Sequence, residues 1–417
     1  MADIRMFRAI RPESRMASKI AALPYDVYNR KEAKEEVLHH PDSFLAIDRA
    51  ETSFDDSVDT YEECVYQKAN SILQDKIKKG DFIQDDVPMY YIYALTMNDR
   101  TQHGFTACAS IDDYLNQVIK KHENTREDKE LDRIRHVDVC SMQTGPIFLT
   151  YRQNAELKAI MEEEISHSPV YDFVSEDGIG HTVWCIESEA TQKRLRKAFE
   201  NLDSVYIADG HHRCASAVKV GLKRREEHPD YTGEEEFNSF LAVLFPEEEL
   251  MIMDYNRVLK DLNGMSEKEL LDGIQEHFEI EQTEITSGGK EIKPDRKGIF
   301  FLYLNNSWYR LTAKEHCFSK DPVKNLDVSI LQDRVLEPLF GIQDPKTDKR
   351  IDFVGGIRGL KELEKRCSRD CKAAFALYPT DICELFAVAD AGLLMPPKST
   401  WFEPKLRSGL FLHKIER

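Results

Sequence analysis

The stretch VYIADGHHRCASAVKVG, residues 205–221, holds the local pattern from which the fold can be worked out. Its first five residues predict a buried strand that ends in the carboxylate of Asp209. Gly210 then permits a tight turn with a positive φ, and the small-residue run after it predicts a helix. A strand, a glycine turn and a helix start therefore bring Asp209, His211, His212 and Arg213 together.

This turn has the chemistry of an anion site. The first N–H groups of a helix have no intrahelical partners, and the helix dipole attracts negative charge, phosphate above all. Arg213 adds a guanidinium whose forked donors suit phosphate oxygens. His211 and His212 add donors that titrate near neutral pH. Asp209, at the strand end, is placed to hold a metal ion or to accept a proton.

Two other interpretations of the same turn stay open. Asp209 could be an ordinary helix N-cap, with solvated histidines and with Arg213 in a surface salt bridge. The paired histidines could instead bind zinc, although neighbours on one helical turn point apart, unlike zinc ligands at i and i+4. We favour the phosphate site, because convergent charge at a helix N-terminus is typical of ligand sites.

The composition indicates an acidic globular protein with more than one core. A length of 417 residues exceeds what one hydrophobic core usually serves, so we expect two cores or one core with a large insertion. The 57 basic and 75 acidic side chains give a net charge of −18, which disfavours binding to nucleic acid. No apolar run approaches the length of a membrane span, so we expect no membrane partner.

The cysteines predict a reducing compartment. There are nine, an odd number, and they are dispersed along the chain. The start, MADIRMFRAIRP, has no apolar core of the kind found in secretory signals. We therefore expect a cytoplasmic location and free thiols.

Strand and helix patterns divide the chain near residue 260. Before it, we expect helices at about 30–40, 57–80, 191–202 and 213–227, and strands at 89–97, 103–111, 146–152, 182–188, 205–209, 239–246 and 250–259. After it, we expect a strand pair at 299–304 and 307–312 and a helix from an Asp327 cap to Gly341. The predicted domains are thus 1–260 and a smaller α/β unit at 261–417, which ends in a loop and a strand.

Three other stretches carry groups suited to chemistry. KKHENTREDKELDR, residues 120–133, includes Glu123, although its charge pattern favours a solvated helix surface. MPPKSTWFEPKLRSG, residues 395–409, places Lys398 and Arg407 in a locally basic loop that could either wrap the core or contact phosphate. Asp26 follows Pro-Tyr in a loop just before a helix. Motifs of P-loop, Rossmann, zincin and α/β-hydrolase proteins are absent from the sequence.

The ordered motifs resemble a known family. The strings FRAIRP, PYDV, PDSFL, KHENT, QTGPIFLTYR, IADGHHR, DYNRV, RIDFVGG, AFALYPT and MPPKSTWFEPKLRSGL together resemble domain-of-unknown-function family 1015 (DUF1015), from about residue 7 to 413. The strand–GHHR–helix element is also similar to the glycine-His/Arg-Arg box of the ParB nuclease-like and sulfiredoxin superfamily. Free-serine kinases of that superfamily carry a closely similar Asp-Gly-His-His-Arg element.

The resemblance implies a fold and a site. The fold would be α+β, with a ParB/sulfiredoxin-like mixed-sheet core, an insertion at about 50–170 and the smaller C-terminal unit. The turn of Gly210, His211, His212 and Arg213 would bind the phosphates of ATP or ADP, and Asp209 would hold Mg²⁺. Lys398 and Arg407 are further candidates for contact with the nucleotide.

The leading hypothesis is a nucleotide-dependent phosphotransferase that acts on a small hydroxylated metabolite, with free serine as the acceptor suggested by the resemblance. Phosphoryl transfer needs positioning and charge stabilisation, and the turn offers groups for both. Glu123 is the first candidate for the catalytic base and Asp26 the second, with the histidines as further catalytic candidates. A non-enzymatic nucleotide-binding regulator related to ParB and a metal-assisted phosphoester hydrolase are the alternatives, and a homodimer stays open.

Overall fold

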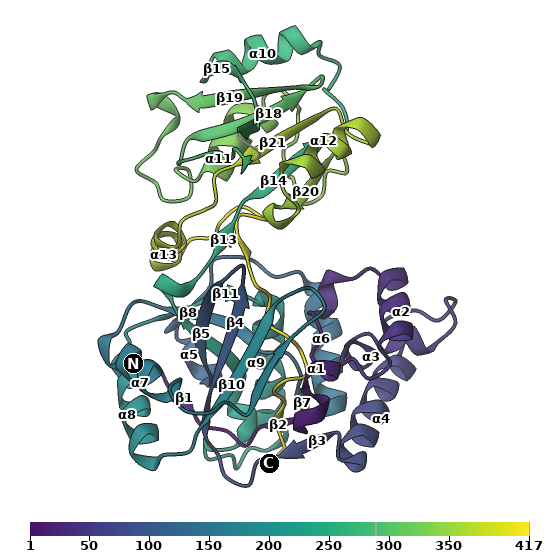
Figure 1. Ribbon diagram of the computed structural model, residues 1–417, viewed down its shortest axis with the longest axis vertical. Helices are drawn as coiled ribbons and strands as arrows, with labels where there is room; N and C mark the ends of the chain where they lie inside the picture. Colours follow the sequence, from purple (N-terminus) through teal and green to yellow (C-terminus); the bar gives the residue numbers. More distant parts are fainter. Residues whose placement is uncertain (288–289, 417) are drawn as a thin grey trace. The chain divides into compact units, whose positions relative to one another are not determined.

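The computed structural model describes residues 1–287 and 290–416 and shows two compact units (Figure 1). The first comprises Met1–Leu250 and Pro404–Arg417, and the second comprises Met251–Glu403. The sequence pattern predicts a division after residue 260, with the whole C-terminus in the second unit. The structure differs because strand β14 (Tyr255–Leu259) pairs within the second unit, while β23 (His413–Lys414) pairs with β7 (Met142–Gln143) of the first.

The first unit is built on a nine-stranded mixed sheet in the order β6-β11-β8-β12-β5-β4-β10-β9, with β1 paired to β5. Its strands are β1 (Ile4–Arg5), β4 (Tyr90–Met97), β5 (Arg100–Ser110), β6 (Ile119–Lys120), β8 (Ile147–Tyr151), β9 (Tyr171–Val174), β10 (Gly180–Ile186), β11 (Val205–Asp209) and β12 (Ser239–Pro246). The pairs β6–β11 and β8–β12 are parallel and the others antiparallel. The expected mixed sheet is present, and its relation to the ParB/sulfiredoxin fold stays a prediction.

The segment at about 50–170, expected as an insertion, supplies β4, β5, β6 and β8 to this sheet. The turn between β4 and β5 is tighter than the predicted five-residue connection. Asn98 and Asp99 both have positive φ values, 50° and 63°, as a two-residue hairpin turn requires. The register of β5 therefore begins at Arg100, opposite Met97.

Helices of the first unit form two groups (Figure 1). The helices α5 (Ile111–Leu115), α7 (Ala155–Glu164), α8 (Glu189–Glu200) and α9 (His211–Glu227) contribute to a core shared with the large sheet. A second core lies among α1 (Ala17–Ile20), α2 (Arg30–His39), α3 (Leu45–Asp48), α4 (Glu63–Lys79) and the end of α6 (Glu127–Cys140). Gly80 ends α4 with φ 79°, as predicted, but α4 begins six residues later than expected.

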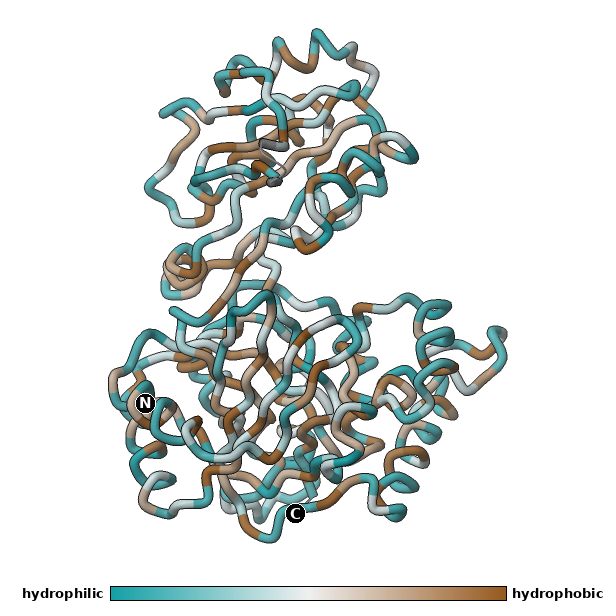
Figure 2. The backbone as a smooth tube through the Cα atoms, in the orientation of Figure 1, coloured by the Kyte–Doolittle hydropathy of each residue, from teal (hydrophilic) through white to brown (hydrophobic). Residues whose placement is uncertain are grey.

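Apolar residues concentrate on the strands of the large sheet, and polar residues on the outer helices (Figure 2). The small pair β2 (Ile10–Pro12) and β3 (Phe82–Gln84) borders the helical group. Within the described ranges, no helix has the length and hydrophobicity needed to cross a bilayer.

The second unit is built on a six-stranded antiparallel sheet in the order β15-β19-β18-β21-β14-β20. The other strands of this sheet are β15 (Phe278–Thr283), β18 (Ile299–Leu304), β19 (Ser307–Ala313), β20 (Ile351–Gly355) and β21 (Ala373–Leu377). Its helices are α10 (Glu267–Gln275), α11 (Asp327–Leu331), α12 (Leu360–Arg369) and α13 (Ile382–Asp390). Two small strand pairs complete it, β13 (Ile252–Met253) with β22 (Trp401–Phe402) and β16 (Thr286–Ser287) with β17 (Lys290–Glu291).

The predicted helix from Asp327 to Gly341 is shorter than expected. The α-helical part ends at Leu331, and Gln332–Leu336 continue as a π-helical turn. Asp327 is also not the N-cap, since its carboxylate accepts the backbone N–H of Gly298 at 3.0 Å. Burial raises the pKa of this carboxyl to about 7.

Helix α9 packs so closely on its neighbours that one position tolerates only glycine. A Cβ atom at Gly221 would lie 2.5 Å from the carbonyl oxygen of Phe237 and 2.9 Å from a side-chain carbon of Ile111. We therefore expect Gly221→Ala to destabilise the protein by about 1–3 kcal/mol through overpacking, although alanine is the better helix former. Urea unfolding followed by circular dichroism measures this, and an unchanged midpoint would contradict the close packing.

Candidate functional site at the start of helix α9

The turn between β11 and α9 requires glycine for two reasons. Gly210 has φ 91° and ψ 30°, a left-handed conformation that other residues rarely adopt. A Cβ atom there would also lie 3.0–3.2 Å from three atoms of the Arg213 guanidinium. A β-bulge between Ile207 and Asp209 shifts the register of β11 just before the turn, and bulges of this kind redirect side chains near functional sites.

Asp209 is not the N-cap of α9, so the ordinary-cap interpretation is wrong. The N-cap position is Gly210, and no side chain in the described ranges caps the helix. The Asp209 carboxylate instead accepts the N–H of Gly210 at 2.9 Å and an ion-pair hydrogen bond from Lys405 at 3.0 Å. The first N–H groups of α9 are therefore left for another acceptor.

Positive charge surrounds the Asp209 carboxylate. Burial acts to raise its pKa, but Lys405 and Arg213 outweigh that effect and hold the pKa below the usual range. About a third of the side chain is exposed, 36%. Asp209 is consequently ionised at neutral pH and accessible to a ligand.

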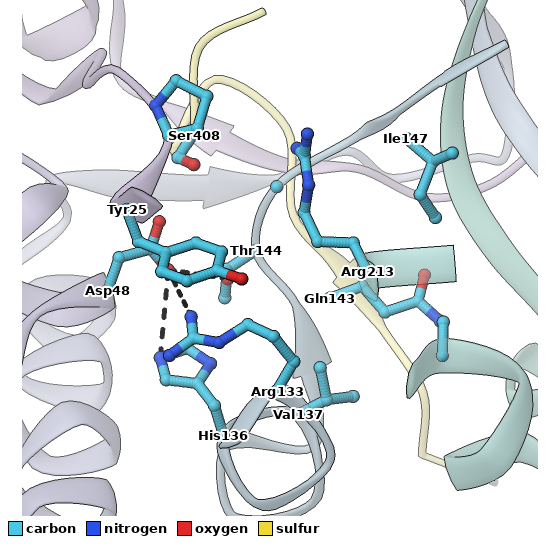
Figure 3. A pocket seen from close by; sticks show the side chains of 13 residues that line it. Tyr25, Asp48, Arg133, His136, Val137, Gln143, Thr144, Ile147, Arg213 and Ser408 are labelled. Atoms are coloured by element: carbon cyan, nitrogen blue, oxygen red, sulfur yellow. Dashed lines mark hydrogen bonds and ion pairs between the residues drawn. The ribbon is translucent and has the colours of Figure 1, made fainter. Parts of the chain in front are cut away.

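Arg213 connects this turn to a cavity in the first unit (Figure 3). One of its guanidinium nitrogens donates to the carbonyl oxygen of Pro146 at 2.6 Å, and a Cβ atom at Gly145 would lie 3.4 Å from that nitrogen. The cavity has a volume of about 30 Å³, enough for about one water molecule. Its polar lining includes Tyr25, Asp48, Arg133, His136, Gln143, Thr144, Arg213 and Ser408.

A cluster of buried charges lies on the cavity side of α6. The Arg133 guanidinium is 3.0 Å from Asp132 and 3.8 Å from Asp48, and it lies 4.0 Å from the ring centroid of Tyr25. Burial opposes the charge of Arg133, but Asp132, Tyr25 and Asp48 together raise its pKa. Arg133 is therefore a permanent cation whose charge is balanced by its own chain.

Asp48 ties this cluster to the loop before β8. Its carboxylate accepts a hydrogen bond from the Thr144 hydroxyl at 3.1 Å and lies 3.9 Å from His136. Burial lowers the pKa of His136, and one of its ring nitrogens has no partner in the described residues. The imidazole is thus neutral at physiological pH.

A larger cavity of about 310 Å³ adjoins the first and shares four of its lining residues, Tyr25, Asp48, Arg133 and His136. This is within the size range of small-molecule sites. Asp26 lines it from the turn Tyr25–Val27. Asp26 therefore lines a cavity next to the one that Arg213 lines.

The stretch 120–133 is not the solvated helix surface that its charge pattern favours. Its helical part belongs to α6, where Asp132 and Arg133 are buried in the charged cluster. Sequence reasoning missed Asp48 and His136. The polar residues Gln143, Thr144 and Gly145 directly before a strand do indicate a loop beside a pocket, and all three line the cavity.

The other part of this stretch contacts the α9 turn directly. His122 packs edge-on against His211, with ring centroids 4.5 Å apart, and the Glu123 carboxylate lies beside both. The adjacent His212 turns the other way, and its Nε2 accepts the backbone N–H of Arg126 at 3.0 Å. The two neighbouring histidines thus point apart, as helical geometry requires.

The two basic candidates of the C-terminal loop each have partners in their own unit. Arg407 is buried and donates to Ser175 at 3.2 Å, and it forms an ion pair with Asp177. Lys398 belongs to the second unit, where its ammonium lies 5.7 Å from the ring centroid of Tyr255. The residue of this loop that reaches the turn is Lys405, which belongs to the predicted basic stretch but was not one of the two named candidates.

Residues 4–329 of the sequence match the family described as "Protein of unknown function (DUF1015)". The chain belongs to this family. No curated protein matches the sequence. The DUF1015 protein is also similar to several solved structures.

A free serine kinase in complex with AMP is similar at 15% identity and a TM-score of 0.35, over 72% of this chain and 91% of that chain. SbnI with a C-terminal truncation, from Staphylococcus aureus, is similar at 10% identity and a TM-score of 0.37, over 72% and 85%. A conserved hypothetical protein from Pyrococcus furiosus is similar at 14% identity and a TM-score of 0.35, over 73% and 94%.

Removing one partner from the buried cluster on α6 should destabilise the protein measurably. Asp132→Ala leaves Arg133 without its closest anion and removes the acceptor of the Tyr66 hydroxyl. We expect a loss of about 3–5 kcal/mol in the free energy of unfolding, because a buried charge is left without its partner. Asp128→Ala, one turn earlier on the exposed face of α6, is the matched control and should change it by under about 1 kcal/mol. Equal losses in the two variants would contradict this account of the cluster.

Proposed function

We propose that this DUF1015 protein is a nucleotide-dependent phosphotransferase that acts on a small hydroxylated metabolite. The observation that carries the proposal is the uncapped start of α9, where the Gly210 turn, Arg213 and an ionised Asp209 converge. A helix start with free N–H groups and an adjacent guanidinium is suited to phosphate. The neighbouring cavities, which share four lining residues, then offer space for an acceptor beside it.

The phosphates of ATP or ADP would lie on the turn of residues 210–213. Backbone N–H groups of the first turn of α9 would donate to the phosphate oxygens. Arg213 keeps one nitrogen on the Pro146 carbonyl, which fixes the guanidinium and leaves its remaining donors for phosphate. This arrangement stabilises the charge that develops on the transferred group.

The donor set also fits Mg²⁺. Asp209 is ionised and a third exposed, and each of its oxygens makes one hydrogen bond to the chain, so each keeps a lone pair. Mg²⁺ is commonly held by one or two carboxylates together with substrate phosphates. When bound, the ion neutralises phosphate charge, while Lys405 holds the Asp209 carboxylate in place.

Asp26 is the base that we propose for the acceptor hydroxyl. It lines the 310 Å³ cavity, which shares Tyr25 and Arg133 with the cavity of Arg213. An acceptor bound there would present its hydroxyl toward the turn, and Asp26 would take up the proton during transfer. We place Asp26 ahead of Glu123 because the Glu123 carboxylate lies against two imidazoles instead.

Free serine is the acceptor that we would test first. The Asp-Gly-His-His-Arg element at residues 209–213 resembles that of free-serine kinases in sequence. A cavity of about 310 Å³ has room for an amino acid, and its lining carries both charge signs, as a zwitterion requires: Arg49, Lys129 and Arg133 with Asp26, Glu51 and Asp132.

The experiment incubates the purified protein with Mg²⁺, ATP or ADP, and a pool of free amino acids and other small alcohols. The proposal predicts a phosphorylated acceptor, detected by ³¹P NMR, whose formation requires both nucleotide and acceptor. Free phosphate released without dependence on an acceptor would instead indicate a hydrolase. Nucleotide binding without any product would indicate a regulator, and either result would overturn the proposal.

Arg213→Ala should lower the rate about 10²-fold or more, because it removes a donor aimed at the transferring phosphate. Arg213→Lys keeps the charge without the fork and should recover part of the rate. Lys223→Ala, on the exposed far part of the same helix, is the matched control and should retain the wild-type rate. An Arg213→Ala protein with normal nucleotide affinity and normal rate would remove the turn from the mechanism.

A further inference from the structure

We propose that His122, Glu123 and His211 form a binding site for a divalent transition-metal ion of the zinc class, distinct from the Mg²⁺ site proposed at Asp209. One ligand atom from each of these three residues lies within 4.8 Å of the other two. The proposal does not depend on the phosphotransferase reaction, since it concerns binding of the metal alone.

Burial of two unpartnered nitrogens is the main observation. His122 is 2% exposed and His211 is 7% exposed, so both imidazoles are removed from water. Nδ1 of His122 and Nε2 of His211 each have no hydrogen-bond partner among the described residues. A buried polar atom without a partner is destabilising, and a metal ion would supply the missing partner for both.

The second nitrogen of His122 is already in use. It hydrogen-bonds to the backbone carbonyl of Ile207, on the strand that leads into the turn. A carbonyl accepts only from an N–H group, so this bond fixes the tautomer and leaves the lone pair on Nδ1. Metal-binding histidines are commonly oriented in this way, by donating their other N–H to a backbone carbonyl.

The protonation states also suit a metal. Burial lowers the pKa of His122 to about 4 and lowers that of His211 well below its usual value. Both imidazoles are therefore neutral at physiological pH, and a neutral imidazole is the form that binds metal. The charge of Asp209 acts on both rings in the opposite direction and adds negative potential for a cation.

The two chain segments that supply the ligands are held together independently of any metal. The Arg126 N–H donates to His212 at 3.0 Å, and the Ser216 hydroxyl donates to the Glu130 carbonyl at 3.1 Å. These bonds join the loop that carries His122 and Glu123 to the first turns of α9. The ligand atoms need to approach by about 1 Å to reach the distances of a tetrahedral site, in which metal–ligand bonds are about 2.0–2.2 Å.

The donor set selects the kind of metal. Two imidazoles and one carboxylate suit Zn²⁺, Co²⁺, Mn²⁺ or Fe²⁺, whereas Mg²⁺ and Ca²⁺ prefer oxygen ligands. Three protein ligands leave a fourth position for water or a substrate oxygen, as in catalytic rather than structural zinc sites. The inferred site is thus open as well as specific.

The test measures Zn²⁺ and Co²⁺ binding to protein stripped of metal by a chelator, in the presence of excess Mg²⁺ and without nucleotide. Residues His277, His316 and Cys317 form another group that could hold a metal, so every protein in the comparison carries His316→Ala. We expect one Zn²⁺ ion per chain by calorimetry, and a Co²⁺ spectrum without a thiolate charge-transfer band.

Glu123→Gln, which keeps the shape of the side chain, and His122→Asn should each weaken Zn²⁺ binding at least about 100-fold, since loss of supporting partners alone costs 10–100-fold. Zn²⁺ should raise the melting temperature of the parent protein but not that of Glu123→Gln. His167→Gln, at an exposed histidine of the same unit, is the matched control and should bind as the parent does.

The outcomes separate cleanly. If His122→Asn does not fold, Glu123→Gln decides the question, because its side chain is less buried. A parent protein that binds no Zn²⁺ or Co²⁺ when Mg²⁺ is in excess would overturn the proposal. So would a folded Glu123→Gln protein with parental affinity. If phosphotransferase activity persists in the chelated protein, the proposed function stands. The metal site is then decided by the binding measurements alone.

Discussion

The contact between the Arg213 guanidinium and the Gly210 turn is the constraint on which the rest of the site depends. A Cβ atom at Gly210 would lie only 3.0–3.2 Å from the Arg213 guanidinium, and one at Gly145 would lie 3.4 Å from the same group. The Pro146 carbonyl then fixes its direction. The Arg213 cation therefore lies close to two glycine backbones, Gly210 at the start of α9 and Gly145 in the loop before β8.

Two groups of charged side chains lie near Arg213. On one side, Asp209 pairs with Lys405 at a partly exposed position. On the other side, Arg133 is balanced by Asp48 and Asp132 in a fully buried cluster. Buried ion pairs contribute little net stability compared with apolar packing of the same volume, so their presence here points to a requirement of the site. Arg133 and Asp48 of the buried cluster line the cavity, and the Asp209–Lys405 pair lies partly exposed beside the start of α9.

The sequence predicted those parts of the structure that depend on local pattern. The strand and helix on either side of Gly210, the helix stop at Gly80 and the strand pair around residues 305–306 all follow from periodicity and turn residues. The family was also recognisable from its ordered motifs. The helix of Ala155–Glu164 was missed. The helix from Asp327 was predicted to be too long, since the α-helical part gives way to a π-helical turn after Leu331. Asp327 contacts Gly298 and is not the expected cap.

The candidate site could be predicted only in its contiguous part. Residues 209–213 are neighbours in sequence, whereas Lys405 lies 196 positions from Asp209, and Asp48 lies 96 positions from Thr144. No local pattern connects such pairs. His122 and Glu123 were visible as part of a charged stretch, but their burial against His211 follows from the pairing of β6 beside β11, which periodicity does not reveal.

The position of Lys405 has a consequence for the order in which the protein is made. The partner of Asp209 is encoded after the whole second unit, within the segment Pro404–Arg417 that returns to the first. On the ribosome, the first 250 residues therefore emerge without the strand β23 and without this cation. Asp209 therefore gains its Lys405 partner only after the whole second unit has been synthesised.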